Sequence, residues 1–128
     1  MIHEGQVVLF RFPQTDLTAG KLRPALVLRR LPGPYDDWLI CMISSQLDQE
    51  IPGLDEVVSL GDPDFAQSGL KSPSVIRASR IAVVGAGTLL GAIGEISADR
   101  LIRTRAALAD WIRGGDPGPQ AGAPTAPE

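Results

Sequence analysis

The stretch VVLFRFPQTDLTAGKLRPALVL, residues 7–28, contains two apolar segments separated by a polar loop. Residues 6–12 are rich in β-branched and aromatic side chains, which is typical of a strand, and Pro13 ends it. Residues 13–21 carry the Pro, Asp and Gly that turns need. Residues 23–30 predict a second strand, with its proline at the start, where a missing N–H costs least. The stretch therefore predicts a hairpin-like unit.

Further strands and one helix are predicted beyond this unit. A nearly unbroken apolar run at 38–44 indicates a strand buried on both faces. Ser97 is a good N-cap, and the apolar spacing that follows predicts a helix that the pair Gly114-Gly115 ends. The other expected segments are strands at 54–60 and 92–96, one long or two bulge-separated strands over 73–84, and a turn or single helical turn over 61–69.

Five to seven short strands followed by one helix predict a mainly β fold built on a small, strongly curved antiparallel sheet. Strands do not alternate with helices, so nothing favours a parallel sheet. Residues 1–113 are long enough for one domain with its own core. Residues 114–128 are rich in Pro, Gly and Ala, and we expect this tail to be disordered.

Composition and charge limit the function classes. The chain has 128 residues, 44% hydrophobic and 21% charged, and one cysteine, Cys41, which excludes a disulfide within the chain. Its start lacks a signal-peptide pattern and no apolar run has membrane-spanning length, so we expect a cytoplasmic protein. The net charge of -3 does not favour nucleic-acid binding. Acidic residues are concentrated at 36–64, and a basic stretch lies on each side of them in the sequence. A fold that brought the two basic stretches together would make a positive groove, although charge alone favours a surface on which acidic and basic side chains are mixed.

Four segments of the chain resemble the PemK/MazF family of bacterial toxins. They are FRFPQTD at 10–16, KLRPALVL at 21–28, ISSQ at 43–46 and GLKSPSVIR at 69–77, in the family's order over roughly residues 4–112. The second segment is the most specific. The resemblance implies a small SH3-like antiparallel β-barrel with a C-terminal helix, usually a homodimer. It also implies a type II toxin that cleaves single-stranded RNA without a metal or cofactor.

The resemblance places the catalytic residues at Arg23 and Ser44, where the family more often has Thr at the second position. Cleavage in the family proceeds by attack of the RNA 2′-hydroxyl on the adjacent phosphate. A guanidinium offers a charged, planar fork to a phosphate, and a hydroxyl offers a donor. One preorganised donor is worth roughly 3–4 kcal/mol in an oxyanion hole. Arg stays protonated, so electrostatic stabilisation is the expected role of Arg23, ahead of the acid/base role that the resemblance implies.

Several polar side chains are candidate RNA contacts. Lys71 and Arg77 would touch phosphates, while Gln46 could read a base edge on unpaired RNA. Arg77 would be structural if it paired with an acid from the middle of the chain. The full expected set is Lys21, Gln46, Lys71, Ser74 and Arg77. The implied partners are single-stranded RNA, a second copy of the chain, and an acidic, partly disordered antitoxin, through which alone operator DNA would be contacted.

Other motifs favour simpler interpretations. His3 is the single histidine, so a two-histidine ribonuclease mechanism is unavailable within one chain, and we expect it at the surface. No spacing matches a zinc site, and the acids at 62–64 are expected to be solvated turn residues, so no metal is predicted. Residues 85–91 lack the third glycine of a dinucleotide fingerprint. Cys41 is expected in the core, and Trp111 in the core or at a dimer interface.

Two alternatives to the nuclease remain open. Toxins that poison DNA gyrase share this barrel and use the end of the terminal helix, which requires exposed Trp111 and Ile112. The Arg-Pro strand argues against this alternative, because gyrase poisons do not need it. The third possibility is an inactive, toxin-like binding module, which the acidic pI of about 5.1 favours.

Overall fold

The computed structural model describes residues 1–11 and 21–116. The predicted loop at 13–21 lies outside these residues except for Lys21, as does most of the predicted tail. The described part contains six strands, two α-helices and two short 3₁₀-helices. These are β1 (Gln6–Arg11), β2 (Leu22–Arg30), β3 (Asp37–Ser44), η1 (Leu47–Gln49), β4 (Glu56–Val58), α1 (Phe65–Ser68), β5 (Ser74–Gly85), η2 (Ala86–Thr88), β6 (Leu89–Glu95) and α2 (Ala98–Ile112).

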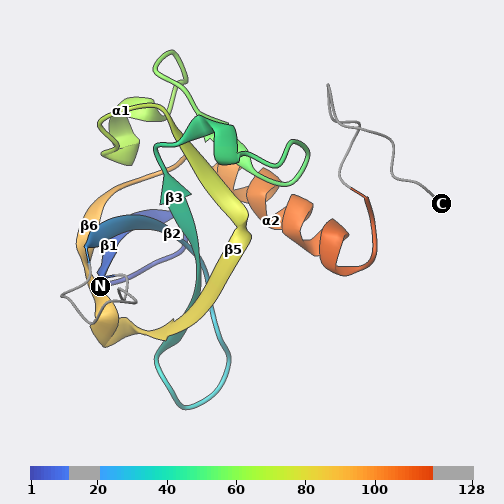
Figure 1. The fold of residues 1–128 in the computed structure, drawn as a ribbon. Coiled ribbons are helices and arrows are strands. Elements are labelled where there is room, and N and C mark those ends of the chain that lie inside the picture. Colours follow the sequence, from blue (N-terminus) through green and yellow to red (C-terminus); the bar gives the residue numbers. More distant parts are fainter. Residues whose placement is uncertain (12–20, 117–128) are drawn as a thin grey trace.

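The six strands form one antiparallel sheet in the order β4-β5-β3-β2-β1-β6. Figure 1 shows the sheet curling into a ring, with α2 packed outside it next to β5. The sheet is not closed, since the edge strands β4 and β6 each pair with one neighbour in the described residues. The predicted mainly β antiparallel fold with a C-terminal helix is therefore confirmed, as a strongly curved open sheet.

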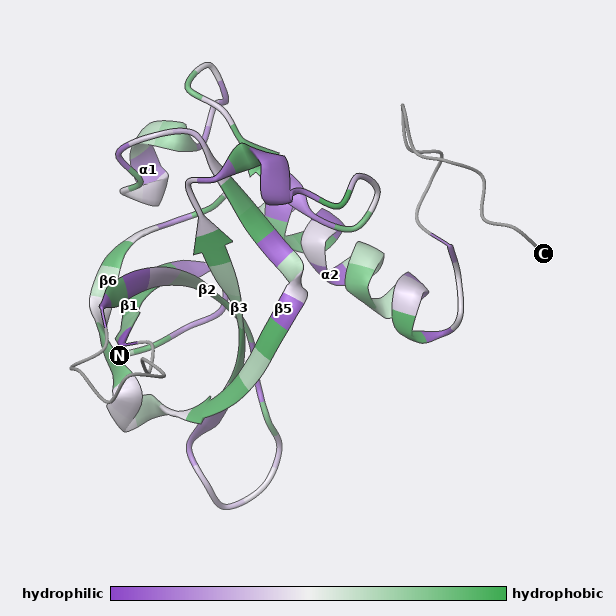
Figure 2. Ribbon diagram, in the orientation of Figure 1, coloured by the Kyte–Doolittle hydropathy of each residue, from purple (hydrophilic) through white to green (hydrophobic). Residues whose placement is uncertain are grey.

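β3 lies at the centre of the sheet between β2 and β5, which explains its apolar sequence. Ala25 and Val27 on β2 belong to one buried cluster with Ile40 of β3. Leu26 of β2 and Cys41 of β3 belong to a second cluster on the other face. Alternate side chains of a strand point to opposite faces, so both faces of the central strands are buried, as predicted. Figure 2 shows the hydrophobic colour of β3, in keeping with its apolar sequence.

β5 is one long strand with a bulge. Its pairing with β3 jumps from Met42–Arg77 to Cys41–Ile81, so residues 78–80 are extra on β5. The buried carboxylate of Asp55 stabilises the bulge by accepting hydrogen bonds from the backbone N–H and hydroxyl of Ser79, at 3.1 and 3.2 Å. The bulge bends β5 and allows it to follow both the flat centre and the curled end of the sheet.

The C-terminal helix begins as predicted. The Ser97 side chain accepts a hydrogen bond from the backbone N–H of Arg100 at 3.1 Å. Leu108 packs into the core, and Gly114, with φ of +96°, follows the helix end. Trp111 is 52% exposed, so of its two predicted positions the core is excluded and the dimer interface stays a prediction. Within the described residues, no helix has the length and apolarity needed to cross a membrane.

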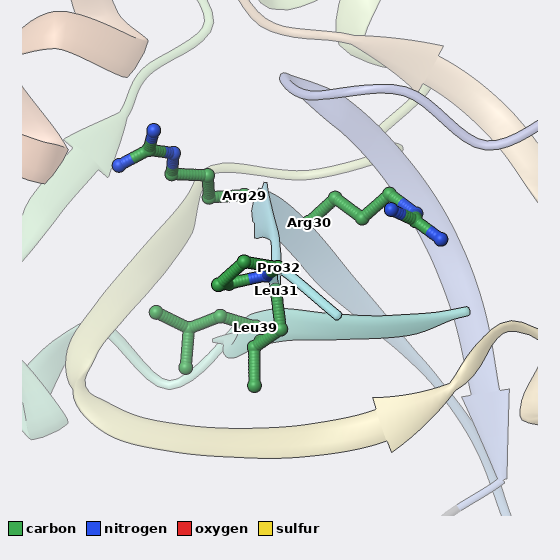
Figure 3. Close-up of a pocket in the computed structure, with 5 residues that line it drawn as sticks. All are labelled: Arg29, Arg30, Leu31, Pro32 and Leu39. Carbon is green, nitrogen blue, oxygen red and sulfur yellow. The ribbon is translucent and has the colours of Figure 1, made fainter. Parts of the chain in front are cut away.

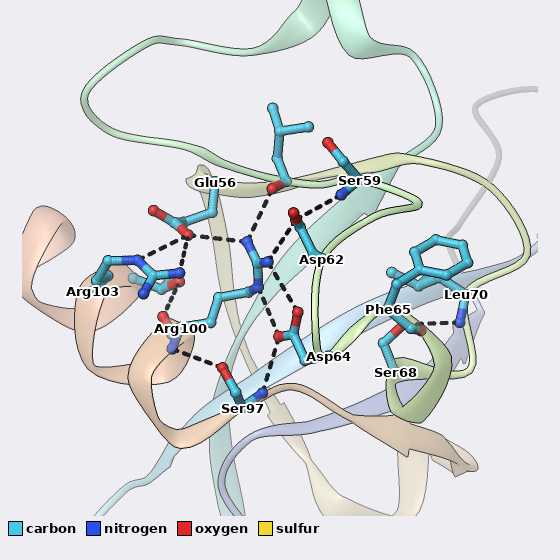
Figure 4. Close-up of polar contacts among 12 residues, drawn as sticks. Glu56, Ser59, Asp62, Asp64, Phe65, Ser68, Leu70, Ser97, Arg100 and Arg103 are labelled. Carbon is cyan, nitrogen blue, oxygen red and sulfur yellow. Dashed lines mark hydrogen bonds and ion pairs between the residues drawn. The ribbon is translucent and has the colours of Figure 1, made fainter.

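A buried arginine joins α2 to the loop after β4, as Figure 4 shows. The guanidinium of Arg100 binds Asp64 through Nε at 2.8 Å and Nη2 at 3.0 Å. It also binds Asp62 at 2.9 Å and Glu56 at 3.1 Å. The expectation that Asp64 is a solvated turn residue is therefore wrong: it is 2% exposed. The hydrogen bond from Arg100 lowers the pKa of the Asp64 carboxyl to about 2.

Candidate functional site

Arg23 lies near the start of β2, where the strand reaches solvent. Its Cα pairs with that of Phe10 on β1, and its side chain is exposed. Within residues 1–11 and 21–116 the Arg23 guanidinium forms no ion pair. The preceding Lys21 is exposed as well. The exposed start of β2 thus offers two positive charges to a solvent-borne anion.

A groove of about 400 Å³ lies beside this end of β2. It brings together three of the predicted site residues, Arg23, Lys71 and Ser74, although 48 residues separate the first two in the chain. Its floor is mainly apolar, and Ser45 and Ser72 add hydroxyls. The lining residues are Leu9, Leu22, Arg23, Pro24, Ile43, Ser45, Gly69, Leu70, Lys71, Ser72, Ser74 and Ile93.

Ser44 is half-buried at the end of β3 and is not among the residues that line the groove, whereas Ser45 is. The pairing of β2 with β3 ends at Ala25–Met42. Continued by two residues, the same register would set Arg23 opposite Ser44, on the same face of the sheet. The Ser44 hydroxyl oxygen accepts a hydrogen bond from the backbone N–H of Gln46 at 3.1 Å.

Gln46 and Arg77 are connected through a residue that the sequence did not single out. Arg77 donates from Nη1 to the Gln49 side-chain oxygen at 3.3 Å, and Gln49 donates from Nε2 to the Gln46 side-chain oxygen at 3.2 Å. Arg77 therefore contacts an amide rather than an acid from the middle of the chain. Its Nε is buried without a hydrogen-bond partner in the described part of the chain. Gln49 carries no sequence signal, because it meets Arg77 only after folding.

The charges divide into paired and unpaired groups. Arg30, Arg100, Arg103, Arg105 and Arg113 each form an ion pair with a carboxylate. Among the described residues, Lys21, Arg23, Lys71 and Arg77 form none, and neither do Arg29 and Arg80. Four of the six cations named as unpaired are thus predicted site residues. No carboxylate of residues 1–11 or 21–116 forms an ion pair with them.

A second pocket, of about 380 Å³, lies at the other end of β2 and is drawn in Figure 3. Arg29 and Arg30 are among its lining residues, but their guanidinium groups point to opposite sides. Arg30 is also bound to Asp36 at 3.2 Å. The two arginines therefore do not converge on one anion, and this pocket is a weaker candidate than the groove beside Arg23.

An apolar hollow of about 330 Å³ lies between β5 and α2. Leu54 and Leu108 contribute to its wall, and Ile81 and Trp111, 45% and 52% exposed, lie at its rim. Beside it, Ile112 at the end of α2 is 63% exposed. The site has no titratable side chain in its lining and offers no catalytic chemistry.

The histidine His3 and the cysteine Cys41 do not line any of these three pockets. His3 is exposed near the N-terminus, as predicted. Cys41 is fully buried, as predicted, and burial raises the pKa of its thiol, with the charge of Asp55 adding to the effect. Among the described residues, no three His, Cys, Asp or Glu side chains are grouped to hold a metal ion.

Comparisons with known proteins identify the family. The fold resembles that of the Mycobacterium tuberculosis toxin MazF-mt6, with a TM-score of 0.62 and 19% identity over 87% of this chain and 98% of that chain. It also resembles an endoribonuclease in complex with its cognate antitoxin from a mycobacterial species, with a TM-score of 0.57 and 19% identity over 88% of this chain and 96% of that chain. A search of curated proteins found no match. The profile of the PemK-like, MazF-like toxins of type II toxin-antitoxin systems matches residues 3–112, and the chain therefore belongs to this family.

Proposed function

We propose that this toxin is an endoribonuclease that cuts single-stranded RNA without a metal ion. The 2′-hydroxyl loses its proton to water and attacks the adjacent phosphorus, the bond to the 5′-oxygen breaks as that oxygen takes up a proton, and the products are a 2′,3′-cyclic phosphate and a 5′-hydroxyl. Negative charge gathers on the phosphoryl oxygens during this step. The protein must therefore supply preorganised donors and positive charge at the phosphate.

Four cations without an ion pair in the described residues carry this proposal, and two of them, Arg23 and Lys71, line the groove. A guanidinium already bound to a carboxylate must give up that contact before it can bind phosphate. Lys21, Arg23, Lys71 and Arg77 have no such carboxylate among the described residues. Arg77 also has a buried Nε–H that finds no hydrogen-bond partner among the residues the structure describes, which lowers stability and so favours a functional reason for its position.

Arg23 and Ser44 are the proposed catalytic pair. Arg23 stabilises the charge on the phosphoryl oxygens and, second, supplies a proton to the leaving 5′-oxygen. The Ser44 oxygen already accepts the N–H of Gln46, so the hydroxyl hydrogen is free to donate to the phosphate. Lys21, Lys71 and Arg77 would bind flanking phosphates, and Ser74 would add a hydroxyl contact.

Cleavage of a mixed-sequence RNA in EDTA by the purified protein tests this proposal. We expect Arg23→Ala and Ser44→Ala each to lower the rate by about 100-fold or more, since one preorganised donor is worth roughly 3–4 kcal/mol. Ser45→Ala is the matched control, because it removes the neighbouring hydroxyl, which lines the groove. If Ser45→Ala abolishes cleavage and Ser44→Ala does not, Ser45 is the catalytic hydroxyl. No cleavage by the wild-type protein would indicate an inactive binding module.

We also propose the partners that such a toxin requires. One of the similar structures is an endoribonuclease bound to its cognate antitoxin. For this chain we propose an acidic, partly disordered antitoxin that covers the cations beside the groove, and contact with operator DNA only through that antitoxin. A cytoplasmic homodimer completes the proposal, with the exposed Trp111 available to its interface.

The exposed side chains at the end of α2 are compatible with one alternative to the nuclease. A gyrase-binding toxin requires exposed Trp111 and Ile112, and they are 52% and 63% exposed in the single chain. A homodimer that uses the same face would cover them. Light scattering and a pull-down with purified gyrase, each on wild-type protein and Trp111→Ser, separate the two. If Trp111→Ser loses the dimer, Trp111 belongs to the dimer interface. If it loses capture by gyrase, the gyrase-binding alternative is favoured.

A further inference from the structure

Two glutamines and an arginine form a chain of hydrogen bonds that leads from the sheet to the surface. Arg77 Nη1 donates to Gln49 Oε1 at 3.3 Å, and Gln49 Nε2 donates to Gln46 Oε1 at 3.2 Å. Arg77 and Gln49 are half-buried, whereas Gln46 is exposed. The chain thus has an inner end fixed in the fold and an outer end that faces solvent.

The direction of each hydrogen bond in this chain is fixed by Arg77. An arginine side chain has donors and no acceptor. Gln49 must therefore turn its oxygen to Arg77, which leaves its NH₂ for Gln46. Gln46 must in turn offer its oxygen to Gln49. The orientation of both amides, which are free to flip in isolation, is determined by a residue 31 positions away from Gln46 in the chain.

The outward group of Gln46 is consequently its NH₂, a donor. A glutamine with both amide ends free offers a donor and an acceptor, and can pair in two places with adenine. A glutamine whose oxygen is already engaged favours an acceptor on the base. At position 4 of a pyrimidine and position 6 of a purine, uracil and guanine carry keto oxygens, which accept, whereas cytosine and adenine carry amino groups, which donate.

Building on the proposed nuclease function, we propose that Gln46 selects a keto base, uracil or guanine, at one position beside the cleaved phosphate, and that Gln49 is the residue that sets this selectivity. The position follows from the backbone. The backbone N–H of Gln46 donates to the hydroxyl oxygen of Ser44 at 3.1 Å, so the residue whose side chain reads the base is held next to the proposed catalytic hydroxyl. The base that Gln46 reaches is therefore a near neighbour of the reacting phosphate.

Cleavage of a randomised RNA pool, followed by sequencing of the new 5′ ends, tests the proposal. For the wild-type protein we expect one position near the cut to favour uracil and guanine over cytosine and adenine by about fivefold, the effect of roughly one neutral hydrogen bond. Gln49→Glu should reverse this preference at the same position. The carboxylate accepts from Arg77 and cannot donate to Gln46, so the Gln46 amide must flip and present its oxygen.

Two further variants keep the test decisive. Gln49→Leu removes both hydrogen bonds, and we expect the keto-to-amino ratio to fall to about one because the Gln46 amide then rotates freely. Gln6→Glu is the matched control, because it makes the same chemical change at the first residue of β1. There the side-chain oxygen of Gln6 accepts a hydrogen bond from the backbone N–H of His3 at 2.8 Å. Gln6→Glu should leave the ratio unchanged. The ratio is the readout because it does not depend on the total rate, which a change near Arg77 also lowers.

The outcomes separate this inference from the nuclease proposal. Cleavage that shows no keto preference, or a preference that survives Gln49→Glu in a folded variant, refutes the role of Gln46 and Gln49 while the nuclease stands. A preference reversed equally by Gln6→Glu refutes it too, because the effect would then follow added charge. If the wild-type protein neither binds nor cleaves RNA, the nuclease proposal and this inference fail together.

Discussion

Replacing the buried carboxylate of Asp64 should weaken the attachment of α2 more than any surface change of the same kind. Asp64 accepts two hydrogen bonds from the Arg100 guanidinium, at 2.8 and 3.0 Å, and one from the backbone N–H of Ser97 at 3.0 Å. The side chains of Arg100 and Asp64 are 6% and 3% exposed. In Asp64→Asn the amide keeps one acceptor and turns its NH₂ towards a guanidinium N–H, so one attraction becomes a repulsion.

Two routes give the magnitude. Breaking one partner of a buried ion pair costs roughly 3–5 kcal/mol, and the remaining contacts of Arg100 with Asp62 and Glu56 favour the lower end. Independently, a pKa of about 2 for Asp64, against an ordinary value of 3.8, corresponds to about 2 kcal/mol of stabilisation when the carboxyl is ionised. Asp64→Asn should therefore lower the free energy of unfolding by about 3 kcal/mol, or Tm by roughly 10 °C.

The assay is urea unfolding followed by circular dichroism, for wild-type protein, Asp64→Asn and Asp99→Asn. Asp99 is exposed in the first turn of the same helix, so its change should cost less than about 1 kcal/mol. The folded-state pKa of Asp64 is depressed, so its stabilisation is present above about pH 4 and is lost as the pH falls towards about 2. The difference between wild type and Asp64→Asn should shrink over that range. Equal costs at the two positions would refute the reasoning.

Other changes test the packing and the core. Gly69→Ala should strongly lower the free energy of unfolding, because φ is +76° and an added Cβ would lie 2.1 Å from the carbonyl oxygen of Ile93. The control is Gly33→Ala, where φ is +117° and an added Cβ would meet no atom within 4 Å, and thermal unfolding should show a cost of about 1 kcal/mol. Cys41 should resist iodoacetamide in the folded protein and react at the global unfolding rate, as mass spectrometry would show; fast alkylation in the native state would contradict its burial. Ser97→Ala should cost about 1 kcal/mol through loss of the helix cap, and no change in urea midpoint would refute the cap.

Local patterns predicted most of the strands and the helix. The apolar run at 38–44 became β3 (Asp37–Ser44), and the cap at Ser97 begins α2. The predicted strand at 54–60 is reduced to β4 (Glu56–Val58), because Asp55 leaves the strand pattern to hold the bulge of β5. A carboxylate that serves a distant strand has no signature in its own segment.

The candidate site was only partly accessible from the sequence. Arg23 was selected through the family resemblance, Lys71 and Ser74 were selected as polar candidates for RNA contact, and the three line one groove. Gln49 was missed, because nothing in a short polar segment marks a glutamine that meets Arg77 after folding. The choice of Ser44 rather than Ser45 as the catalytic hydroxyl rests on the family resemblance. Ser45 lines the groove with Arg23, and the register of β2 with β3, continued by two residues, would set Ser44 opposite Arg23.

The sequence by itself determined the order of strands and helix, the burial of β3 on both faces, the start of α2 and membership of the toxin family, because apolar runs, helix caps and motifs are local. Only the tertiary structure decided which charges are neutralised. Arg100 meets Asp64 across 36 residues and Arg77 meets Gln49 across 28, while the cations beside the groove meet no described carboxylate. The strength and direction of such contacts depend on burial and three-dimensional proximity, which spacing along the chain does not encode.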